Sequence, residues 1–256
     1  MKLSAAITIH DRPRDVLTRV FDSMKPQSHD EFIIVLDRTP NPLADWVRAY
    51  WALDERTKIV KISGEPGWVS PVRAWNRAFK AVTGDYIYCF SSETVQAEGN
   101  IERAKAFLAD GSTLVQGAAT CSCGPGGTEV NWGGTAPGNL LCDAAHPRPL
   151  GFIWAAPMLA VNDIDGYDDN FSRGLWYDDN DFFVRLWRRG LDFLFADAIS
   201  GIHIHHDRPV LSTPEGQAKI AHNAALITAK FGTVDPWANT PRISTFKPGE
   251  TRWSHI

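Results

Sequence analysis

Cysteine and methionine are scarce in this chain of 256 residues, which has 4 of the first and 3 of the second. Cys89, Cys121, Cys123 and Cys142 match no zinc-binding spacing. No secretory signal precedes them, so we expect free thiols and a cytoplasmic location. The scarcity also excludes a disulfide-stapled scaffold, because a chain of this length can bury a core of its own.

Strong charge and long hydrophobic runs are also missing. The net charge of −4 gives no basic surface for nucleic acid, so we expect no nucleic-acid partner. The longest apolar stretch, residues 151–161, is too short to be a transmembrane segment. Residues 123–138 are rich in glycine, but they contain neither a GxGxxG opening a helix nor a Walker-A lysine. This stretch is a surface connection or a flap over a substrate, and the sequence leaves both open.

Tryptophan, in contrast, is abundant, with 10 residues. We expect most of them in the core. Exposed indole rings stack on sugar rings and nucleobases, however, so some are expected to line a cleft.

Strands and helices alternate in the first third of the sequence. Apolar runs predict strands at 3–9, 31–36, 57–62 and 86–90, and helical spacing predicts helices at 14–24, 42–52 and 71–82. This alternation is typical of an α/β fold with a mainly parallel sheet flanked by helices. Ligands bind beyond the carboxyl ends of such strands. The residues at those ends are polar: His10-Asp11-Arg12, Asp37-Arg38 and Ser91-Ser92-Glu93.

The second half is less regular. Helices are expected at 101–108 and 215–231, a strand at 113–118, a pair of strands within 152–161, and two short strands at 191–196 and 200–205. We expect one domain over 1–232, with a first half at 1–94 and a smaller second half at 95–232. Residues 233–256 are expected to form a C-terminal tail.

Residues 176–190 concentrate acidic side chains before an amphipathic helix. Asp178, Asp179 and Asp181 precede apolar residues at helical spacing. The structural interpretation is a buried helix with an acidic start. Three carboxylates are more than a cap needs, because two of them a few ångströms apart repel by roughly 3 kcal/mol at an effective dielectric of about 20. A cation, a substrate hydroxyl or a raised pKa is therefore expected nearby.

Several short motifs, taken in order, resemble one family. They are Thr8-Ile9-His10-Asp11-Arg12-Pro13, Val35-Leu36-Asp37, Arg73-Ala74-Trp75-Asn76-Arg77-Ala78, Gly84-Asp85-Tyr86-Ile87, Gly166-Tyr167-Asp168 and Asp178-Asp179-Asn180-Asp181-Phe182. Together they resemble the nucleotide-sugar glycosyltransferases of the GT-A fold, family 2 type, over most of the chain to about Gly232.

The resemblance implies roles for individual residues. Asp179 would be the base that deprotonates the acceptor hydroxyl, with Asp178 as the runner-up. Asp181 would support the start of the helix. The residues that would hold the nucleotide are Thr8, His10, Asp11, Arg12, Asp37, Arg73, Ser91 and Ser92.

One motif departs from the family. Where the family has D-x-D, this chain has Ser91-Ser92-Glu93, so Glu93 would be its only acidic metal ligand. The family often supplies a histidine as well, which makes His203 and His205 candidates. Alternation along a strand would place both on one face, with Ile202 and Ile204 toward the core. Because a serine hydroxyl is a weaker ligand than a carboxylate, three outcomes stay open: a divalent ion, Mn²⁺ or Mg²⁺, binds more weakly than in the family, the charge of the diphosphate is met in another way, or activity is lost.

The resemblance thus implies an enzyme that moves a sugar from a nucleoside diphosphate sugar, a UDP-sugar first of all, to an acceptor hydroxyl with inversion. The acceptor is a glycan, a lipid-linked intermediate or a protein. The main alternative is a sugar-nucleotide-binding protein of the same fold with impaired catalysis. A nucleotidyltransferase would need glycines that residues 3–14 lack. The strand–helix alternation disfavours a carbohydrate-binding module, and the order of His203, His205, His206 and Asp207 disfavours a metallo-hydrolase.

Overall fold

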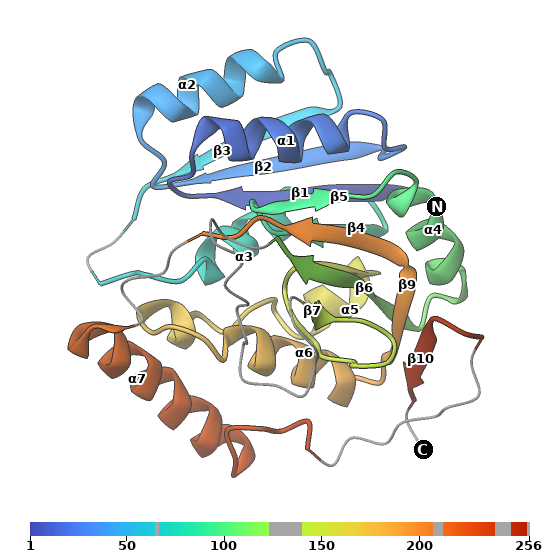
Figure 1. Cartoon of the computed structure of the whole chain (residues 1–256). Helices are drawn as coiled ribbons and strands as arrows, with labels where there is room; N and C mark the ends of the chain where they lie inside the picture. Colours follow the sequence, from blue (N-terminus) through green and yellow to red (C-terminus); the bar gives the residue numbers. More distant parts are fainter. Residues whose placement is uncertain (65–66, 123–139, 207–211, 239–246, 255–256) are drawn as a thin grey trace.

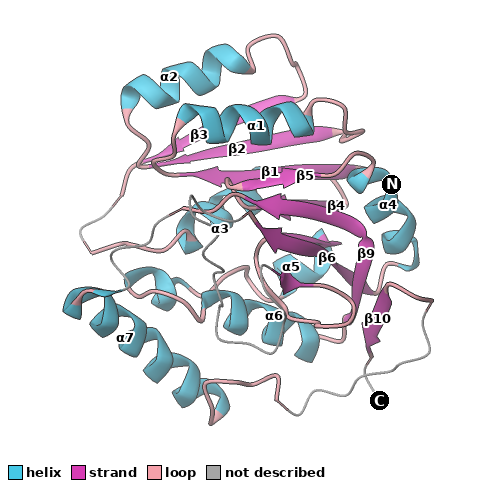
Figure 2. Ribbon diagram, in the orientation of Figure 1, coloured by secondary structure: helices cyan, strands magenta, loops and turns pink. Residues whose placement is uncertain are grey.

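The computed structural model describes residues 1–64, 67–122, 140–206, 212–238 and 247–254. In these residues a single sheet runs through the molecule in the order β10-β9-β6-β8-β4-β1-β2-β3 (Figures 1 and 2). The expected α/β architecture is confirmed. The glycine-rich residues 123–138 and Cys123 lie outside the described residues.

The first half of the chain forms the parallel part of the sheet. Strands β1 (Leu3–Ile9), β2 (Glu31–Asp37), β3 (Thr57–Ile62) and β4 (Tyr86–Phe90) pair in parallel, in the order β3-β2-β1-β4. Helices α1 (Arg14–Met24), α2 (Asn41–Tyr50) and α3 (Val72–Ala81) connect them. The sequence predicts these elements to within two residues, because apolar runs broken by polar or proline-containing turns mark both ends of each.

The second half joins the same sheet with mixed directions. β8 (Ile153–Pro157) lies antiparallel between β4 and β6 (Thr113–Cys121), and β6 pairs in parallel with β9 (Asp192–His203). The short β5 (Thr94–Gln96) and β7 (Leu140–Cys142) pair with β9 and β6. The helical segments of this half are α4 (Asn100–Phe107), the 3₁₀ turn Leu108–Asp110, α5 (Met158–Asp163), the 3₁₀ turn η2 (Asp169–Arg173), α6 (Asp178–Arg188) and α7 (Pro214–Phe231).

Two expectations for this half are wrong. Residues 152–161 are not a strand pair: β8 ends at Pro157, which has no N–H to continue the ladder, and α5 follows. The two short strands expected at 191–196 and 200–205 are one strand, β9. Its pairing with β6 shifts between Gly117 and Ala118, which face Ala196 and Ser200, so the residues between form a bulge.

The C-terminal region also contributes to the sheet. β10 (Glu250–Trp253) pairs antiparallel with β9, and the Trp253 side chain is 1% exposed. Figure 1 shows β10 at the lower right, beside the end of the sheet that lies farthest from β3.

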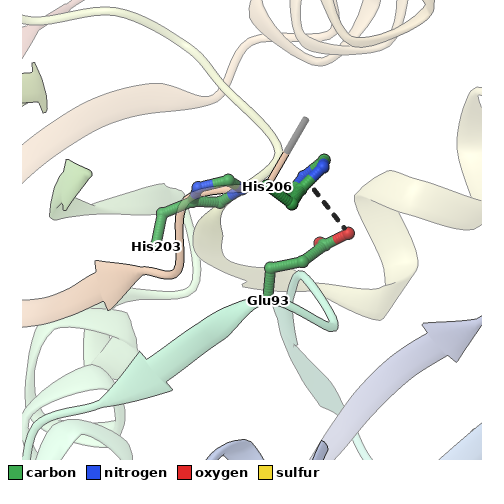
Figure 3. Close-up of side chains that lie close together, drawn as sticks. All are labelled: Glu93, His203 and His206. Atoms are coloured by element: carbon green, nitrogen blue, oxygen red, sulfur yellow. Dashed lines mark ion pairs between the residues drawn. The ribbon is translucent and has the colours of Figure 1, made fainter. Parts of the chain in front are cut away.

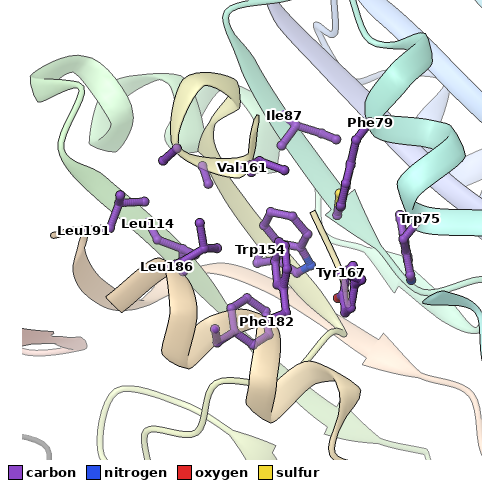
Figure 4. Close-up of a cluster of buried hydrophobic side chains, with 14 of the residues drawn as sticks. Trp75, Phe79, Ile87, Leu114, Trp154, Val161, Tyr167, Phe182, Leu186 and Leu191 are labelled. Atoms are coloured by element: carbon purple, nitrogen blue, oxygen red, sulfur yellow. The ribbon is translucent and has the colours of Figure 1, made fainter. Parts of the chain in front are cut away.

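Helices cover both faces of the sheet, and each face has its own hydrophobic core. Alternate residues of β1 separate the two: Ala5 and Ile7 pack with α1, α2 and α4, whereas Ala6 packs with α3, α5 and α6. Figure 4 shows the second core, where Trp154 of β8 lies among Phe79, Tyr167 and Phe182. The Tyr167 and Phe182 rings stack with their centroids 4.1 Å apart. This packing fixes the start of α6 against the sheet.

Cys89, Cys121 and Cys142 are buried free thiols, as expected. Among the described residues, no helix combines the length and hydrophobicity that crossing a lipid bilayer requires.

Candidate active site

The first part of the site lies beyond the carboxyl end of β2, where Asp37 ends the strand. Its side chain is 2% exposed, and its two carboxylate oxygens accept hydrogen bonds from Arg38 Nε and Nη2 at 2.8 and 3.0 Å. His10 lies beside it, with Nδ1 2.7 Å from the Asp37 carbonyl oxygen. The structure therefore brings His10 and Asp37 together, as predicted.

Arg38 itself is a residue that the sequence analysis did not single out as a site residue. It has a φ of 53°, in the left-handed region that is unusual for a residue other than glycine. Its guanidinium lies 5.0 Å from the Trp68 ring centroid and donates to the Trp68 carbonyl. Arg73 lies over the same ring, at 5.4 Å. Two cations thus share one buried indole at this edge of the sheet.

The altered metal motif, Ser91-Ser92-Glu93, forms the turn between β4 and β5. Ser91 Oγ lies 2.7 Å from Thr94 Oγ1, and Thr94 N donates to the Ser91 carbonyl at 3.1 Å. Ser92 and Glu93 are buried, with 6% and 5% of their surface exposed. The turn is therefore held by its own hydrogen bonds, and it points one carboxylate into the site.

Glu93, His203 and His206 form a cluster suited to a metal ion. Their ligand atoms all lie within 4.8 Å of one another, and Glu93 Oε1 is 3.6 Å from His206 Nε2 (Figure 3). Figure 3 shows the two imidazole rings above the Glu93 carboxylate. His203 also contacts two other residues: its Nδ1 lies 3.8 Å from Cys121 Sγ, and its ring centroid lies 4.9 Å from that of Phe152.

The predicted histidine pair is separated in the structure. His203 faces inward at 1% exposure, whereas Ile202 points outward at 48%, so the expectation that Ile202 faces the core is wrong. β9 lies between β5 and β6 at this point, where its inward face covers the Ser91-Ser92-Glu93 turn. The chain leaves the strand after His203, so strand alternation no longer applies. His206, which the sequence analysis did not propose as a ligand, reaches Glu93. The described contact of His205 is a backbone N–H donated to Ser122 Oγ at 2.8 Å.

Arg12 shares the Glu93 carboxylate. Its Nε donates to Glu93 Oε1, the oxygen that also faces His206. Its Nη1 donates to the Asp11 carbonyl at 2.9 Å, while the Asp11 side chain is exposed. The sequence analysis assigned Arg12 to the nucleotide, and in the structure it pairs with Glu93 of the possible metal-binding cluster.

The acid pair lies at the start of α6. Asp179 Oδ1 accepts from the Tyr167 hydroxyl at 2.9 Å, and Asp179 Oδ2 accepts from Gly151 N at 3.1 Å. A Cβ at Gly151 would lie 2.8 Å from that carboxylate oxygen, so glycine is required for the close approach. Burial and the neighbouring Asp179 carboxylate raise the pKa of Asp178 from 3.8 to about 7. Burial also raises the pKa of Asp179, against the two hydrogen bonds that it accepts.

The third acid of the helix has a structural role. Asp181 is fully buried and pairs with Arg185 at 2.7 Å and with Lys230 of α7. Arg185 also donates to the carbonyls of Ile164 and Gly166. Asp181 therefore ties α6 to α7 through Lys230.

The backbone before the acid pair is strained. Trp176 and Tyr177 have φ values of 63° and 61°, so two consecutive non-glycine residues adopt the left-handed region. Such conformations cost on the order of 1–3 kcal/mol each and persist where the surroundings impose them. Tyr177 is the residue that begins α6, so this turn sets the direction in which Asp178 and Asp179 enter the helix.

A single dipeptide, Gly151-Phe152, connects the acid pair to the metal cluster. Gly151 N donates to Asp179, the Phe152 carbonyl accepts from Ser91 N at 3.1 Å, and the Phe152 ring contacts the His203 ring. Asp179, Ser91 and His203 belong to three separate motifs of the sequence, and all three contact this one dipeptide. Thr8 lies in β1, where it pairs with Val35 of β2. Arg73 pairs with Asp169 at 3.4 Å and lies beside Trp68.

The family model for glycosyl transferase family 2 matches residues 4–138, just over half of the chain. The chain belongs to this family. The suspected GT-A glycosyltransferase relationship is therefore confirmed, and the protein is a family 2 glycosyltransferase. No curated protein sequence matches the chain.

Solved structures show the same fold at low sequence identity. The crystal structure of S. aureus TarS 1–349 in complex with UDP-GlcNAc has a TM-score of 0.59 and 14% identity, covering 91% of this chain and 73% of that one. GalNAc-T7 with UDP, GalNAc and Mn²⁺ has a TM-score of 0.62 and 13% identity, covering 80% and 44%. The mannosyltransferase PcManGT from Pyrobaculum calidifontis, in complex with GDP-Man and Mn²⁺, has 0.59 and 12%, covering 89% and 64%.

Proposed function

We propose that this family 2 glycosyltransferase transfers a sugar from a UDP-sugar to an acceptor hydroxyl with inversion at the anomeric carbon. The observation that carries the proposal is the Gly151-Phe152 dipeptide, which joins two acids of raised pKa to a carboxylate–imidazole cluster. A reaction that releases a diphosphate and removes a hydroxyl proton needs those two groups on either side of one carbon.

Asp179 is the proposed base, and Asp178 the runner-up. A base works best when its pKa lies near the working pH. The pKa of Asp178 is raised to about 7, and burial raises the pKa of Asp179 as well. Tyr167 and Gly151 hold the Asp179 carboxylate in one orientation. As the acceptor oxygen bonds to the anomeric carbon, the bond to the diphosphate breaks and the hydroxyl proton passes to Asp179.

Glu93, His203 and His206 are the proposed ligands for a divalent ion. One carboxylate and two imidazoles fit Mn²⁺ better than Mg²⁺, which prefers oxygen ligands alone. A bound ion would offset the charge of the leaving diphosphate. Because Arg12 donates to the same Glu93 oxygen, it either moves when the ion binds or meets the diphosphate itself.

The donor is proposed to lie between this cluster and the Asp37 edge of the sheet. TarS in complex with UDP-GlcNAc and GalNAc-T7 with UDP have the same fold, which supports a uridine nucleotide, although PcManGT is in complex with GDP-Man. Asp37, Arg38 and His10 offer hydrogen-bonding groups there for the base and ribose. The proposed location is the cytoplasm, where free thiols such as Cys89 persist.

A sugar-nucleotide-binding protein without turnover is the second candidate, since the metal motif has lost one acid. The raised pKa values argue for catalysis, because a protein that only binds the donor has no use for two crowded carboxylates. Turnover with any acceptor decides between the two.

Calorimetric titration of UDP, with and without Mn²⁺, tests the donor and metal assignments together. We expect UDP binding that strengthens with Mn²⁺ in the wild type and loses that strengthening in Glu93→Ala and His206→Ala. His205→Ala is the matched control and is expected to behave as the wild type. UDP binding that does not change with Mn²⁺ would contradict the metal assignment and would favour Arg12 as the group that contacts the diphosphate. An absence of nucleotide binding would contradict the proposal as a whole.

A further inference from the structure

Trp176 stands apart from the other tryptophans of the protein. Nine of the ten lie in the described part of the chain, Trp132 being outside it, and within those residues Trp176 alone has an exposed side chain, at 45%. The remaining eight are buried or half-buried: Trp46, Trp51, Trp68, Trp75, Trp154, Trp187, Trp237 and Trp253. Among the described tryptophans, Trp176 therefore offers the indole face that a ligand can reach most easily.

The position of Trp176 says which ligand. Trp176 precedes Asp178 by two positions, so the two Cα atoms are at most about 7 Å apart. The nucleotide edge already has its own indole, Trp68, but that ring is 7% exposed and lies under Arg38 and Arg73. Trp176 therefore lies on the acid side of the site, where the acceptor rather than the nucleobase has to approach.

We propose that the Trp176 indole is the subsite for a pyranose ring of the acceptor, and that Asn223 of α7 is the residue that positions it. The inference rests on the proposed function. It narrows the acceptor to a molecule with a sugar ring beside the attacking hydroxyl, because the flat apolar face of a pyranose matches an indole, whereas an acyclic polyol or a serine side chain offers no such face.

Asn223 is a buried polar residue with a clear task. It is fully buried, and its Nδ2 donates to the Trp176 carbonyl at 2.8 Å and to the Phe171 carbonyl at 3.3 Å. Leu175 N donates to the Lys219 carbonyl of the same helix at 3.2 Å. Helix α7 thus holds residues 171–176 at three points, and Figure 1 shows it at the lower left, outside the two helix layers that cover the sheet.

Gly174 confirms how closely the two segments approach. A Cβ at this position would lie 2.0 Å from Asn223 Oδ1, so a side chain there is excluded. Gly174 lies against Asn223, which also binds the Trp176 carbonyl, and the left-handed turn at Trp176 and Tyr177 follows directly. The same turn aims the indole outward and feeds Asp178 and Asp179 into α6.

The test measures sugar binding in the presence of saturating UDP and Mn²⁺. The probes are the methyl pyranosides of glucose, galactose, mannose and N-acetylglucosamine, with sorbitol as the acyclic control, and the readout is saturation-transfer NMR. We expect at least one pyranoside, and not sorbitol, to bind the wild type. Its affinity should fall at least about fivefold in Trp176→Ala, the lower end of what removing a stacked aromatic side chain costs, and less in Trp176→Phe.

Two controls separate positioning from stability. Asn100 is also fully buried and donates to Tyr88 and Ser200, away from the site, so Asn100→Ala should lower the melting temperature as Asn223→Ala does. Of these two variants, only Asn223→Ala should weaken the binding of the pyranoside. Trp46→Ala, on α2, should leave both UDP and pyranoside binding intact.

Three results would overturn the inference while UDP still binds. They are equal binding of sorbitol and pyranosides, unchanged pyranoside affinity in Trp176→Ala, or a loss of UDP affinity in that variant, which would make Trp176 a donor platform. Loss of UDP binding in the wild type would instead refute the proposed function, on which the inference depends.

Discussion

The carboxylates on the two sides of the site have different partners. On the side proposed to hold the nucleotide, Asp37 pairs with Arg38 and Glu93 pairs with Arg12, so each acid is matched by a guanidinium. On the acceptor side, Asp179 accepts from a tyrosine hydroxyl and a backbone N–H, which carry no charge. The two groups come from one chain and lie on either side of Gly151-Phe152.

The difference assigns the two sides different chemistry. A guanidinium framework suits a nucleoside diphosphate, whose phosphates it can contact through several N–H groups. A carboxylate that lacks a cation and is partly removed from water binds a proton more readily, which is what the base in a transfer reaction has to do. Substitutions that exchange or remove these partners test the comparison.

Replacing Asp179 should give the largest effect. Asp179→Asn keeps the size of the side chain and removes the base, so kcat with a productive acceptor should fall about 10²- to 10⁴-fold, the range of general-base catalysis. UDP affinity, measured by calorimetry, should stay unchanged. If Asp178→Asn is the inactive variant and Asp179→Asn retains turnover, the two roles are exchanged.

Removing Asp181 should affect stability instead. Asp181→Ala leaves Arg185 and Lys230 without their buried carboxylate, and breaking such a pair costs about 3–5 kcal/mol of the free energy of unfolding. Urea unfolding measures the loss. Asp163→Ala is the matched control, because Asp163 pairs with Arg189 near the surface and should cost less than about 1 kcal/mol. Equal losses in the two variants would argue against the structural role of Asp181.

On the nucleotide side, Asp37→Ala should weaken UDP about tenfold, since a hydrogen bond to a charged group contributes about 1.5–3 kcal/mol. The loss of Asp37 also releases Arg38 from its left-handed position beside Trp68. Titration of UDP measures the change. Asp45→Ala, which breaks an exposed pair with Arg48 on α2, should leave UDP affinity as it is.

The smallest effect is expected in the pH dependence. Asp178→Asn removes a negative charge beside Asp179, so the pKa of Asp179 should fall and the acidic limb of the pH–rate profile should move to lower pH. The free energy of unfolding should also depend on pH through Asp178. The pKa of Asp178 rises from 3.8 to about 7 on folding, so the folded state holds this proton more tightly. The contribution therefore favours folding at low pH and is lost as pH rises through 7. Urea midpoints at pH 5 and pH 8 should differ less in Asp178→Asn than in the wild type, and an unchanged difference would contradict the assignment.

Much of the nucleotide side could be predicted from the sequence. The apolar runs of β1 to β4 and the polar residues after them place His10, Asp37 and Glu93 at one edge, because parallel strands present their carboxyl ends together. The motif that resembles the family's acidic block also marked Asp179. His206 and Trp68 carried no such signal, since each acts from a loop in which neither strand nor helix periodicity applies.

The sequence by itself determined the order of strands and helices from β1 to β4, the family, and which acids stand at the start of α6. Those features depend on local patterns of apolar and polar residues, which hydrophobic burial enforces. Only the tertiary structure decided that His206 rather than His205 reaches Glu93, that Arg12 shares that carboxylate, and that Asn223 fixes Trp176. These contacts join residues that are 113, 81 and 47 positions apart, and packing of the whole chain, not local sequence, brings them together.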